Sequence, residues 1–440
     1  MTLRFGTDGV RGLAVAELTP TDIVELGRAA ARVLGGHRLL VARDPRRSGP
    51  VLEGAFSAGV AAEGVRVELL GVLPTPGLAV IAAAERVPAA MITASHNPFE
   101  DNGVKLFGAG GRKLTDAQEL AVERTFAELV PPVSRGDAVG EIVERHDGTS
   151  LYEAHLCDRF PAGMLAGLRV AVDAANGAMS QVAPMVLSRL GADVVALHVS
   201  PDGTNINAGC GATAPQSLAA AVREHGADVG LAFDGDGDRV IAVDQLGKVV
   251  DGDRLIALSA IDRRERGILT HDTVVVTVMT NLGFHRAMAE RGIAVVTTPV
   301  GDRAVLEAME EGGFSLGGEQ SGHVIHIDEA PTGDGLLAGL VLLDLMCRTG
   351  CPLDELAQSV MTSYPQVLVN VAVRAQHLDV ANALSGEIAA AERELGGEGR
   401  ILVRASGTEP LVRVMVEAAD DATAHTVAAR LAAAVRERLG

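Results

Sequence analysis

The chain has 440 residues, of which 48% are hydrophobic and 22% are charged, and its formal net charge is -19. This length is typical of roughly three domains, each able to bury its own core. Trp is absent and aromatic residues make up only 2%, which disfavours stacking on nucleic acid and Trp anchoring at a membrane. The acidic balance also repels phosphate polymers. We therefore expect no nucleic-acid partner, whereas a small phosphorylated ligand would need local positive groups or a metal ion.

The chain starts with MTLRFGTDGVRG, which lacks the apolar stretch of a secretion signal, and it contains no run of 18 apolar residues. We therefore expect no membrane association and a cytoplasmic location. The four cysteines form no CxxC pair, although Cys347 and Cys351 could share a helix face. Because no cluster of further ligands accompanies them, we interpret Cys157, Cys210, Cys347 and Cys351 as thiols without a metal.

The stretch LTPTDIVELGRAAARVLGG predicts the first helix. Thr19 is a suitable N-cap, Pro20 suits the first helical position, Asp22 follows three residues after the cap and Gly35 provides a stop. The run RLLVARD follows and predicts a buried strand that ends in charged residues.

Short apolar runs of this kind recur in three sets of three, over residues 39 to 98, 168 to 238 and 273 to 323. Each run ends in a loop of Asp, Asn, Gly, Ser or Pro, and helical spacing separates the runs. This pattern predicts strands that are buried on both faces and joined by helices, in three repeated α/β domains. The tail differs, since strands at VLVNVAVR, RILVRAS and LVRVMVE precede one helix. Its apolar positions Val427, Leu431, Val435 and Leu439 share a face, so we expect a small α+β fourth domain.

The third loop of the second set, FDGDGDRV, places Asp234, Asp236 and Asp238 at alternate positions after a strand. Three carboxylates this close repel one another, and a divalent cation relieves the repulsion. An EF-hand would require Gly and Glu where the chain has Arg239 and Gln245, so that alternative fails. Three oxygen ligands leave Mg²⁺ short of six, which favours a phosphate oxygen as a further ligand.

The third loop of the first set follows the apolar run AAMI and reads TASHNPFEDNGVKLF. It can supply that phosphate if Ser95 is phosphorylated, and His96 and Lys105 add protonatable or positive groups. The pattern matches no acyl-transfer or ATP-binding motif. We expect Asn97 and Pro98 to shape a turn that exposes Ser95.

The third loop of the last set, GGEQSGH, combines Glu319 and Ser321, which could bind sugar hydroxyls, with His323, which could transfer protons near neutral pH. Near the C-terminus, RASGTEPLVR offers two guanidinium groups, two hydroxyls and free backbone N–H groups, a set that suits a phosphate dianion. Its members are Arg404, Ser406, Gly407, Thr408 and Arg413.

Together these motifs resemble the α-D-phosphohexomutase superfamily and, within it, the bacterial phosphoglucosamine mutases. The resemblance covers essentially the whole chain and rests on FGTDGVRG, TASHNPFEDNGVKLF, DGDGDR, TPVGDR, GGEQSGH and RASGTEPLVRVMVE, in the family's order. It implies three homologous α/β domains with mixed sheets and a smaller C-terminal α+β domain around a central cleft. We place them at residues 1–155 (phosphoserine loop), 156–252 (metal-binding loop), 253–363 (sugar-binding loop) and 364–440 (phosphate-binding loop and mobile lid).

The resemblance also implies roles for individual residues. Ser95 would be the phosphoserine, whose phosphate binds Mg²⁺ together with Asp234, Asp236 and Asp238. Arg11 and Lys105 would flank the reacting phosphate, with Lys105 and His323 as candidates for proton transfer. The remaining assignments are Arg239 beside the metal loop, Glu319 and Ser321 at the sugar hydroxyls, Gly301, Asp302 and Arg303 at the sugar and distal phosphate, and the 404–413 segment at the phosphate that does not react.

The implied reaction interconverts glucosamine 6-phosphate and glucosamine 1-phosphate through a 1,6-bisphosphate, for the synthesis of UDP-N-acetylglucosamine and cell-envelope precursors. Glucosamine 1,6-bisphosphate or another hexose bisphosphate would act as activator. The partner is a small sugar phosphate, and homodimer formation is left open. The chain departs from many relatives in having Ala304 where a Tyr is common after VGDR, and LAVAEL where an Asn is common shortly after the first VRG.

Three alternatives remain at this stage. A phosphomannomutase or phosphoglucomutase shares every catalytic element. A non-catalytic sugar-phosphate sensor would be expected to lose Ser95 or one of the aspartates, and all are present. A metal-dependent phosphatase would result if water could reach the phosphoserine.

Overall fold

A computed structural model of the protein describes residues 4–6, 9–130, 136–374, 380–405 and 410–439. It contains two compact units. The first comprises residues 1–279 and 293–358, and the second comprises residues 280–292 and 359–440. Within the described residues, no single helix is long and apolar enough to cross a membrane. One pair of consecutive helices passes that test together, but the two are bent at 101° to each other.

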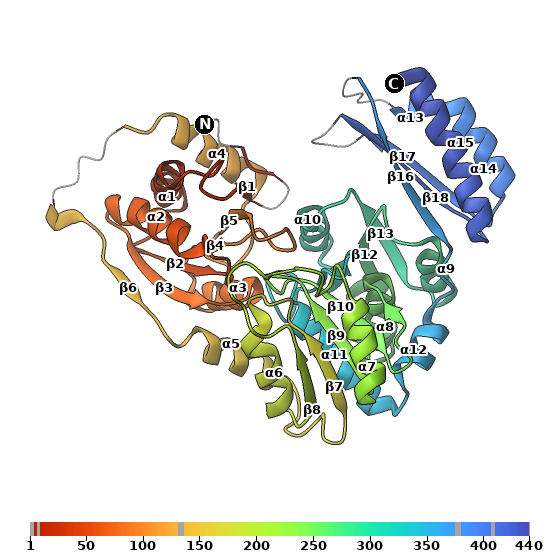
Figure 1. The fold of residues 1–440 in the computed structure, drawn as a ribbon, viewed down its shortest axis with the longest axis horizontal. Coiled ribbons are helices and arrows are strands. Elements are labelled where there is room, and N and C mark those ends of the chain that lie inside the picture. The colour runs from red at the N-terminus through yellow and green to blue at the C-terminus, as the bar shows by residue number, and fades with distance from the viewer. Residues whose placement is uncertain (1–3, 7–8, 131–135, 375–379, 406–409, 440) are drawn as a thin grey trace. The chain divides into compact units, whose positions relative to one another are not determined.

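The first sheet has six strands in the order β1-β5-β4-β2-β3-β6. The helices α1, α2 and α4 pack on one face over a continuous apolar core, and α3 packs against β2 and β4 with residues outside that core, so the sheet is covered on both faces (Figure 1). The strands are β1 (Val10–Leu13), β2 (Arg38–Arg43), β3 (Arg66–Val72), β4 (Ala89–Ile92), β5 (Asp101–Phe107) and β6 (Ile142–Glu144); the helices are α1 (Pro20–Leu34), α2 (Gly49–Ala62), α3 (Thr75–Glu85), α4 (Asp116–Ala127) and α5 (Gly148–Cys157).

The second sheet has the order β11-β10-β9-β7-β8 and the third has the order β13-β12-β14-β15. The second contains β7 (Arg169–Asp173), β8 (Asp193–Leu197), β9 (Val229–Phe233), β10 (Val240–Asp244) and β11 (Val249–Val250), with α6 (Met179–Arg189) and α7 (Gln216–His225). The third contains β12 (Thr273–Thr277), β13 (Ala294–Thr298), β14 (Leu316–Gly318) and β15 (Val324–His326), with α8 (Gly252–Glu265), α10 (Asp302–Gly312), α11 (Gly335–Thr349) and α12 (Leu353–Val360), whose last residues begin the second unit.

The three sheets share one arrangement. In each, the first strand of a set lies between the second and the third and is parallel to both, as in β3-β2-β4, β8-β7-β9 and β13-β12-β14. A fourth strand then pairs antiparallel with the third, and these strands are β5, β10 and β15. The predicted repeat and the mixed sheets are confirmed. The individual sets did not include this fourth strand.

This arrangement positions the candidate site. The turn between the third and fourth strands of each sheet lies at the carboxyl end of the third strand, and open α/β sheets bind ligands at that end. These three turns hold the TASHNP, DGDGDR and EQSGH sequences.

The second unit has its own three-stranded antiparallel sheet, in the order β16-β18-β17. It contains β16 (Gln366–Ala372), β17 (Arg400–Ala405) and β18 (Leu411–Glu417), with α9 (Leu282–Glu290), α13 (Val380–Ala383), α14 (Ser385–Leu395) and α15 (Asp421–Leu439). Val427, Leu431 and Val435 of α15 are buried in its core, and Leu439 packs against that core. The expected small α+β domain is confirmed.

Local sequence signals explain the first helix well. Thr19 caps α1 by accepting a hydrogen bond from the Asp22 N–H, Pro20 is its first residue, and Gly35 ends it at a positive φ of 66°. The cysteines are unpaired, as expected. However, α11 ends at Thr349 with Gly350 as its C-cap, so Cys347 and Cys351 do not share a helix face.

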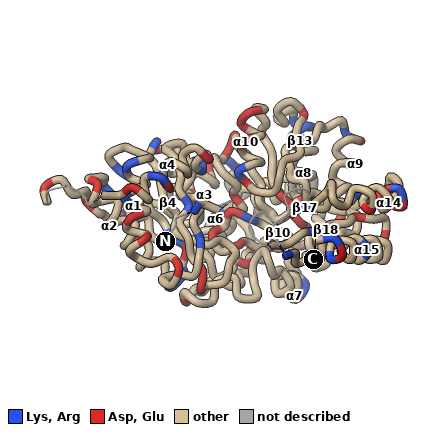
Figure 2. Tube along the Cα trace, turned by 90° about the horizontal axis from the view of Figure 1, so that it is seen from above, with Lys and Arg blue, Asp and Glu red and all other residues tan. Residues whose placement is uncertain are grey.

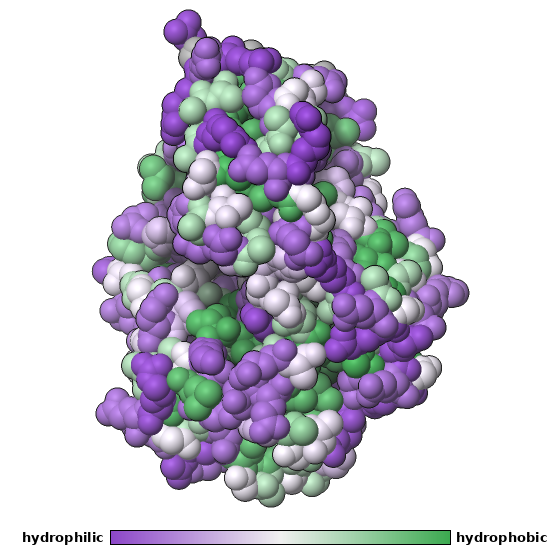
Figure 3. Space-filling model, turned by 90° about the vertical axis from the view of Figure 1, so that its right-hand side faces the viewer, coloured by the Kyte–Doolittle hydropathy of each residue, from purple (hydrophilic) through white to green (hydrophobic). Residues whose placement is uncertain are grey.

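Along the described chain, Lys and Arg residues are interspersed with Asp and Glu residues (Figure 2). On the face drawn in Figure 3, hydrophobic residues lie in small groups among hydrophilic ones.

Candidate active site

Ser95 lies three residues after β4 and its side chain is directed at the second domain. Its hydroxyl donates to Asp234 Oδ2 at 2.7 Å, and its backbone N–H donates to Thr93 Oγ1 at 2.9 Å. The residue has a φ of 53°, which is the left-handed region that non-glycine residues rarely adopt. Such backbone strain is often found at functional sites. The expectation that the turn exposes Ser95 is wrong, because the residue is 1% exposed and the neighbouring loops cover it.

The three aspartates that follow β9 form a compact buried group. Asp234, Asp236 and Asp238 are at most 2% exposed, and each offers a carboxylate oxygen within 4.8 Å of the others. Asp236 Oδ1 and Asp238 Oδ1 have no hydrogen-bond partner among the described residues, although both are buried. Unsatisfied buried oxygens are costly unless something binds them. Because hard oxygen ligands suit Mg²⁺, this group fits a divalent cation.

Electrostatics within the group point the same way. Burial, and then the charges of Asp238 and Asp236, raise the pKa of Asp234 well above its usual value. Burial also acts to raise the pKa of Asp238, but Lys105 and His323 outweigh it and hold that pKa well below its usual value. Without a cation, repulsion within the group therefore disfavours three full negative charges. A dication would relieve that repulsion.

Lys105 supplies positive charge from β5, the antiparallel strand that follows the Ser95 turn. It is 2% exposed, and its Nζ lies 2.7 Å from Asp236 Oδ2 and 3.1 Å from Asp238 Oδ2. Arg11 of β1 donates from Nη1 to the Ala94 carbonyl at 3.5 Å, beside Ser95. The backbone N–H of Arg239 donates to Asp234 Oδ1 at 3.2 Å, and its side-chain Nε lies 4.0 Å from Asp238 Oδ1. The sequence-predicted cations therefore lie beside the serine or the aspartates.

Two histidines border the group, and their pKa values are shifted in opposite directions. His96 Nδ1 lies 3.3 Å from Ser95 Oγ, and burial together with Arg239 and Arg11 lowers its pKa to about 4, so the ring is neutral at neutral pH. His323 is 2% exposed, and its Nδ1 lies 3.8 Å from Asp238 Oδ1. Burial acts to lower the pKa of His323, but Asp238 outweighs it and raises that pKa.

The predicted sugar-binding residues lie in the third domain and are only partly directed at the aspartates. Glu319 Oε1 accepts the Gly301 N–H at 3.0 Å, which joins the two loops, and Ser321 is exposed. Asp302 Oδ2 lies 3.8 Å from His323 Nε2 and connects the loop to the metal group. Arg303, however, is directed at α4 of the first domain, where it pairs with Asp116 at 2.6 Å and with Glu119.

The predicted phosphate-binding segment lies in the second unit. Ser406, Gly407 and Thr408 fall outside the described residues. Arg404 and Arg413 are direct partners on the antiparallel strands β17 and β18, and burial together with the charge of Arg413 lowers the pKa of Arg404. Arg413 Nε is buried without a hydrogen-bond partner among the described residues. Two adjacent like charges of this kind suit an anion.

Three residues at the site were not anticipated from the sequence. Thr75, at the start of α3, donates from Oγ1 to Asp236 Oδ2 at 2.6 Å. Arg46 and Asn207 both donate to the carbonyl of Ser95 at 2.9 Å. The only available signal was their place in loops that follow strands, because none of them belongs to a motif of the metal or serine loops.

A second group of potential ligands, Asp173, His198 and Cys210, lies elsewhere in the second domain. The oxygens of Asp173 accept the backbone N–H groups of Ala175 and Gly211, each at 2.9 Å. These bonds explain the buried carboxylate as the support of two loops, without a metal ion.

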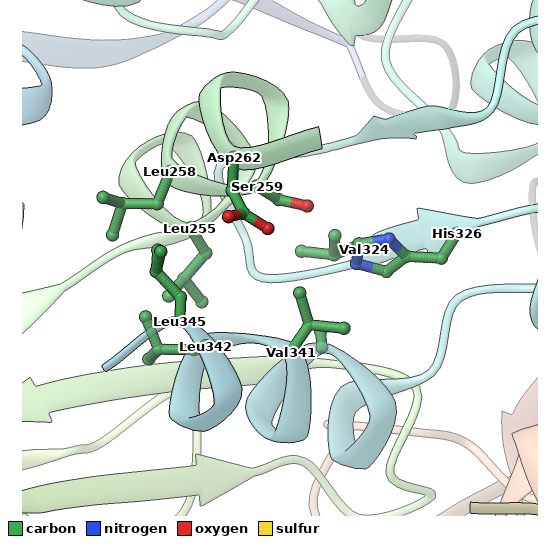
Figure 4. A pocket seen from close by; sticks show the side chains of 10 residues that line it. Leu255, Leu258, Ser259, Asp262, Val324, His326, Val341, Leu342 and Leu345 are labelled. Carbon is green, nitrogen blue, oxygen red and sulfur yellow. The ribbon is translucent and has the colours of Figure 1, made fainter. Parts of the chain in front are cut away.

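A small pocket between α8, α11 and β15 is separate from the site (Figure 4). Leucine side chains from both helices and the Val324 and His326 side chains line it (Figure 4). Its volume of about 10 Å³ is what a single water molecule needs. Burial and the charge of Arg263 lower the pKa of His326 to about 3, so its ring is neutral. The pocket is too small for a sugar phosphate.

Comparison with known families accounts for nearly the whole chain. The three α/β/α domains and the C-terminal domain of the phosphoglucomutase/phosphomannomutase family match in order. Domain I matches residues 2–130, domain II 154–247, domain III 251–364 and the C-terminal domain 368–434. The chain therefore belongs to the phosphoglucomutase/phosphomannomutase family and is an enzyme of the mutase class. The family resemblance seen in the sequence motifs is confirmed.

Curated relatives narrow this class. The chain is 53% identical to a phosphoglucosamine mutase of Frankia casuarinae over 100% of this chain and 99% of the relative. It is 52% identical to a phosphoglucosamine mutase of Saccharopolyspora erythraea, with 98% of each chain covered.

Solved structures share the fold. A phosphoglucomutase/phosphomannomutase family protein of Burkholderia thailandensis has a TM-score of 0.83 at 25% identity, covering 98% of this chain and 97% of the other. An N-acetylphosphoglucosamine mutase of Aspergillus fumigatus, solved with GlcNAc-6P and magnesium, has a TM-score of 0.73 at 19% identity, covering 100% and 96%. At that identity the second likeness concerns the fold alone.

Proposed function

We propose that the protein interconverts glucosamine 6-phosphate and glucosamine 1-phosphate through a phosphorylated Ser95 and a 1,6-bisphosphate, and so supplies amino-sugar phosphate to cell-envelope synthesis. The full-length relatives at 52–53% identity carry the name phosphoglucosamine mutase, which supports the amino sugar as substrate. The four unpaired cysteines fit a reducing compartment such as the cytoplasm.

One observation carries the proposal. Ser95 Oγ lies 2.7 Å from Asp234 Oδ2, at the edge of a buried group of three carboxylates that also contacts Lys105. Ser95 Oγ donates to a carboxylate, and the pKa of about 4 makes the neighbouring His96 ring a weak base, so the arrangement is poorly suited to acyl transfer. As a phosphoserine, Ser95 would present phosphate oxygens to the site that the carboxylates form.

The carboxylates of Asp234, Asp236 and Asp238 would hold Mg²⁺, with an oxygen of the Ser95 phosphate as a further ligand. Bound there, Mg²⁺ would offset the charge of a phosphate that brings roughly -1.5 to -2. Lys105 and Arg11 would add positive charge on the side of the serine. Phosphoryl transfer depends mostly on such positioning and charge stabilisation.

In the first transfer, the bond between Ser95 Oγ and phosphorus breaks while a bond forms from phosphorus to the free hydroxyl oxygen of the sugar. That hydroxyl loses its proton to a group of the chain, and Oγ takes up a proton. Lys105 and His323 are the candidates for these proton movements, since both lie beside Asp238 of the aspartate group. After the bisphosphate turns, its other phosphate returns to Ser95 by the reverse steps.

The other assignments belong to the same proposal. Glu319 and Ser321 would bind sugar hydroxyls, the Gly301–Arg303 loop would bind the sugar and its distal phosphate, and Arg404 and Arg413 would hold the phosphate that does not react. A hexose bisphosphate would load Ser95 initially. The C-terminal domain would close over the bisphosphate as a lid, because the intermediate must turn without escaping.

A phosphomannomutase or phosphoglucomutase is the second candidate, because a putative phosphomannomutase of Thermus thermophilus has a TM-score of 0.82 at 25% identity, covering 99% of each chain. Turnover of glucosamine, glucose and mannose 6-phosphates under matched conditions distinguishes the two. Glucose turnover equal to or above glucosamine turnover would exclude the amino-sugar assignment.

Mass spectrometry tests the covalent step. After incubation with a hexose bisphosphate, the intact protein is expected to gain one phosphate, located on Ser95. Ser95→Ala is expected to take up no phosphate and to lose turnover by about 10⁶-fold, the scale of losing a covalent nucleophile. An unphosphorylated wild type together with an active Ser95→Ala variant would refute the mechanism.

A further inference from the structure

Arg46 is the largest side chain that the structure buries completely, and it lies in the loop between β2 and α2. Its Nε lies 2.9 Å from Asp44 Oδ2, and its backbone N–H donates to Asp44 Oδ1 at 3.0 Å. A buried ion pair is costly unless hydrogen bonds satisfy both partners. The acceptors of the remaining guanidinium N–H groups therefore determine whether this buried pair is satisfied.

Those donors all go to the loop that carries Ser95. Nη2 donates to the Ser95 carbonyl at 2.9 Å and to the Asn97 carbonyl at 2.8 Å, and Nη1 donates to the Asp101 carbonyl at 3.0 Å and to the Pro98 carbonyl. A guanidinium presents five N–H donors in a fixed plane, which an ammonium group cannot reproduce. Arg46 thereby satisfies four backbone carbonyls of one tight turn.

The same ion pair also reaches the N–H side of Ser95. The Ser95 N–H donates to Thr93 Oγ1, and the Thr93 hydroxyl donates to Asp44 Oδ2 at 2.7 Å. Hydrogen bonds therefore run from Arg46 to the Ser95 carbonyl, and from the Ser95 N–H through Thr93 and Asp44 back to Arg46. This closed ring surrounds a residue whose φ of 53° is unfavourable, and it holds the backbone in that conformation.

A residue of the second domain also donates hydrogen bonds to two of these carbonyls. Asn207 Nδ2 donates to Ser95 O at 2.9 Å and to Asn97 O at 3.0 Å. Gly235, in the metal loop, lies so close that a Cβ on it would be 2.5 Å from Ser95 O. The serine loop and the metal loop are therefore held together by backbone contacts, in addition to the side-chain bond from Ser95 to Asp234.

The backbone contacts and the side-chain bond of Ser95 respond differently to phosphorylation. Phosphorylation replaces the proton of Ser95 Oγ, so the hydroxyl can no longer donate to Asp234. The bonds from Arg46 and Asn207 do not involve Oγ and are available in both states. We propose that Arg46, held by Asp44, is a positioning residue that fixes Ser95 against the aspartate group in the phosphorylated and unphosphorylated enzyme, with Asn207 as its counterpart from the second domain. The proposal rests on the proposed function, in which Ser95 carries the phosphate.

Arg46→Lys and Asn207→Gly test the proposal in the full-length protein. Arg46→Lys keeps a positive charge opposite Asp44 but loses the planar set of donors. Asn207→Gly removes the amide, while Gly accepts the positive φ of 57° found at this position. Arg47→Lys is the matched control, because Arg47 is the exposed neighbour of Arg46.

We expect kcat to fall about 100-fold in Arg46→Lys, which is the scale of a misplacement of about 1 Å. In Asn207→Gly we expect about a tenfold fall, the scale of a lost hydrogen bond. KM for the sugar phosphate and the Mg²⁺ affinity of the unphosphorylated protein, measured by calorimetry, are expected to stay within about twofold, because neither variant alters a sugar or metal ligand. A merely structural defect would instead lower Mg²⁺ affinity and kcat together.

Hydrogen exchange at residues 93–101 gives a readout that does not depend on turnover, and exchange in this segment should accelerate in both variants and not in Arg47→Lys. If the wild type is active and both variants keep kcat within about twofold, the positioning role is refuted. If Arg46→Lys does not fold, a kcat within about twofold of wild type in Asn207→Gly alone refutes it. An inactive wild type would refute the proposed function and with it this role, even if exchange accelerates.

Discussion

The turn that carries Ser95 and the loop that carries Arg303 both belong to the candidate site, but they are held in different ways. Ser95 and its partner Asp234 are at most 1% exposed, and buried hydrogen bonds fix them. Arg303 pairs with Asp116, whose side chain is 82% exposed, and with Glu119. The reacting end is therefore preorganised, whereas the proposed sugar-binding end is held in part by an ion pair, to Asp116, that water can replace.

The difference fits the two tasks of a mutase. Phosphoryl transfer requires a fixed geometry, because its rate depends on the placement of charge around the reacting atoms. Recognition must instead accept one sugar in two orientations. An exposed ion pair contributes only about 0–1 kcal/mol, so Arg303 can leave Asp116 for a phosphate at little cost, whereas Glu119 is buried and its pair costs more to break.

Metal removal should have the largest effect on the reacting end. We expect a chelator to lower kcat by about 10³-fold or more, because the phosphate would face three buried carboxylates with only Lys105 and Arg11 as positive charges. Activity is expected to return on adding Mg²⁺, and an assay across a Mg²⁺ titration measures this. Turnover that persists in the chelator would show that Lys105 and Arg11 are sufficient and that the buried carboxylates have another role.

A buried carboxyl next to the metal loop predicts a pH effect on stability. Asp334 caps α11 and accepts the Tyr152 hydroxyl at 2.8 Å, and burial raises its pKa to about 6. The folded state therefore binds a proton that the unfolded state releases near pH 4. Stability should fall by up to about 3 kcal/mol as the pH rises from about 4 to about 6, and then stay level for this group.

Denaturant unfolding of wild type and of Asp334→Asn across this range isolates the effect. The Asn side chain keeps an oxygen for the α11 cap but cannot titrate, so its stability profile should lack that fall. Parallel profiles would mean that Asp334 titrates normally and that the region below the metal loop is more solvated than its burial indicates.

Much of this architecture follows from local sequence. The cap at Thr19, the apolar strands and the three polar loops are readable because each depends on neighbouring residues. Ser95 and the aspartates could be identified because each belongs to a motif of neighbouring residues that directly follows a strand. The ends of parallel strands lie at the same edge of a sheet, so such motifs are expected to line a site.

What could not be predicted depends on contacts between distant segments. Arg46 contacts residues about fifty positions away, and Asn207 reaches Ser95 across 112 positions. The burial of Ser95 follows from these loops covering it, and no motif encodes it. Arg303 was expected at the sugar, but its partners lie on α4, 184 and 187 positions earlier.

Arg303→Gln tests the sugar-binding end directly. Losing one charged hydrogen bond to substrate should raise KM about tenfold. The effect is limited because Arg303 must first give up its ion pairs with Asp116 and Glu119 in order to bind the substrate. We expect kcat to change less than about threefold and the melting temperature to fall, because buried Glu119 loses its partner. Arg112→Gln is the control, because Arg112 forms an ion pair with Glu310 of α10 that is more exposed. A fall in kcat as large as that expected for Arg46→Lys would contradict the assignment of Arg303 to substrate binding rather than to the chemical step.

Val15 offers the smallest test, because it shares the left-handed backbone of Ser95 but receives none of the hydrogen bonds that Arg46 donates. Its φ is 69° and its side chain is 48% exposed. A β-branched residue is a marked outlier there, at a cost of roughly 1–2 kcal/mol. Val15→Asn should therefore raise stability by about 1 kcal/mol without changing kcat, as measured by thermal unfolding and steady-state assays. Leu13→Asn, at an exposed position in the extended strand β1, removes similar apolar surface without relieving strain and should give no gain. If Val15→Asn instead lowered stability, the left-handed backbone at this position would be supported by the valine side chain itself, and strain at Ser95 could not be attributed to function by comparison with it.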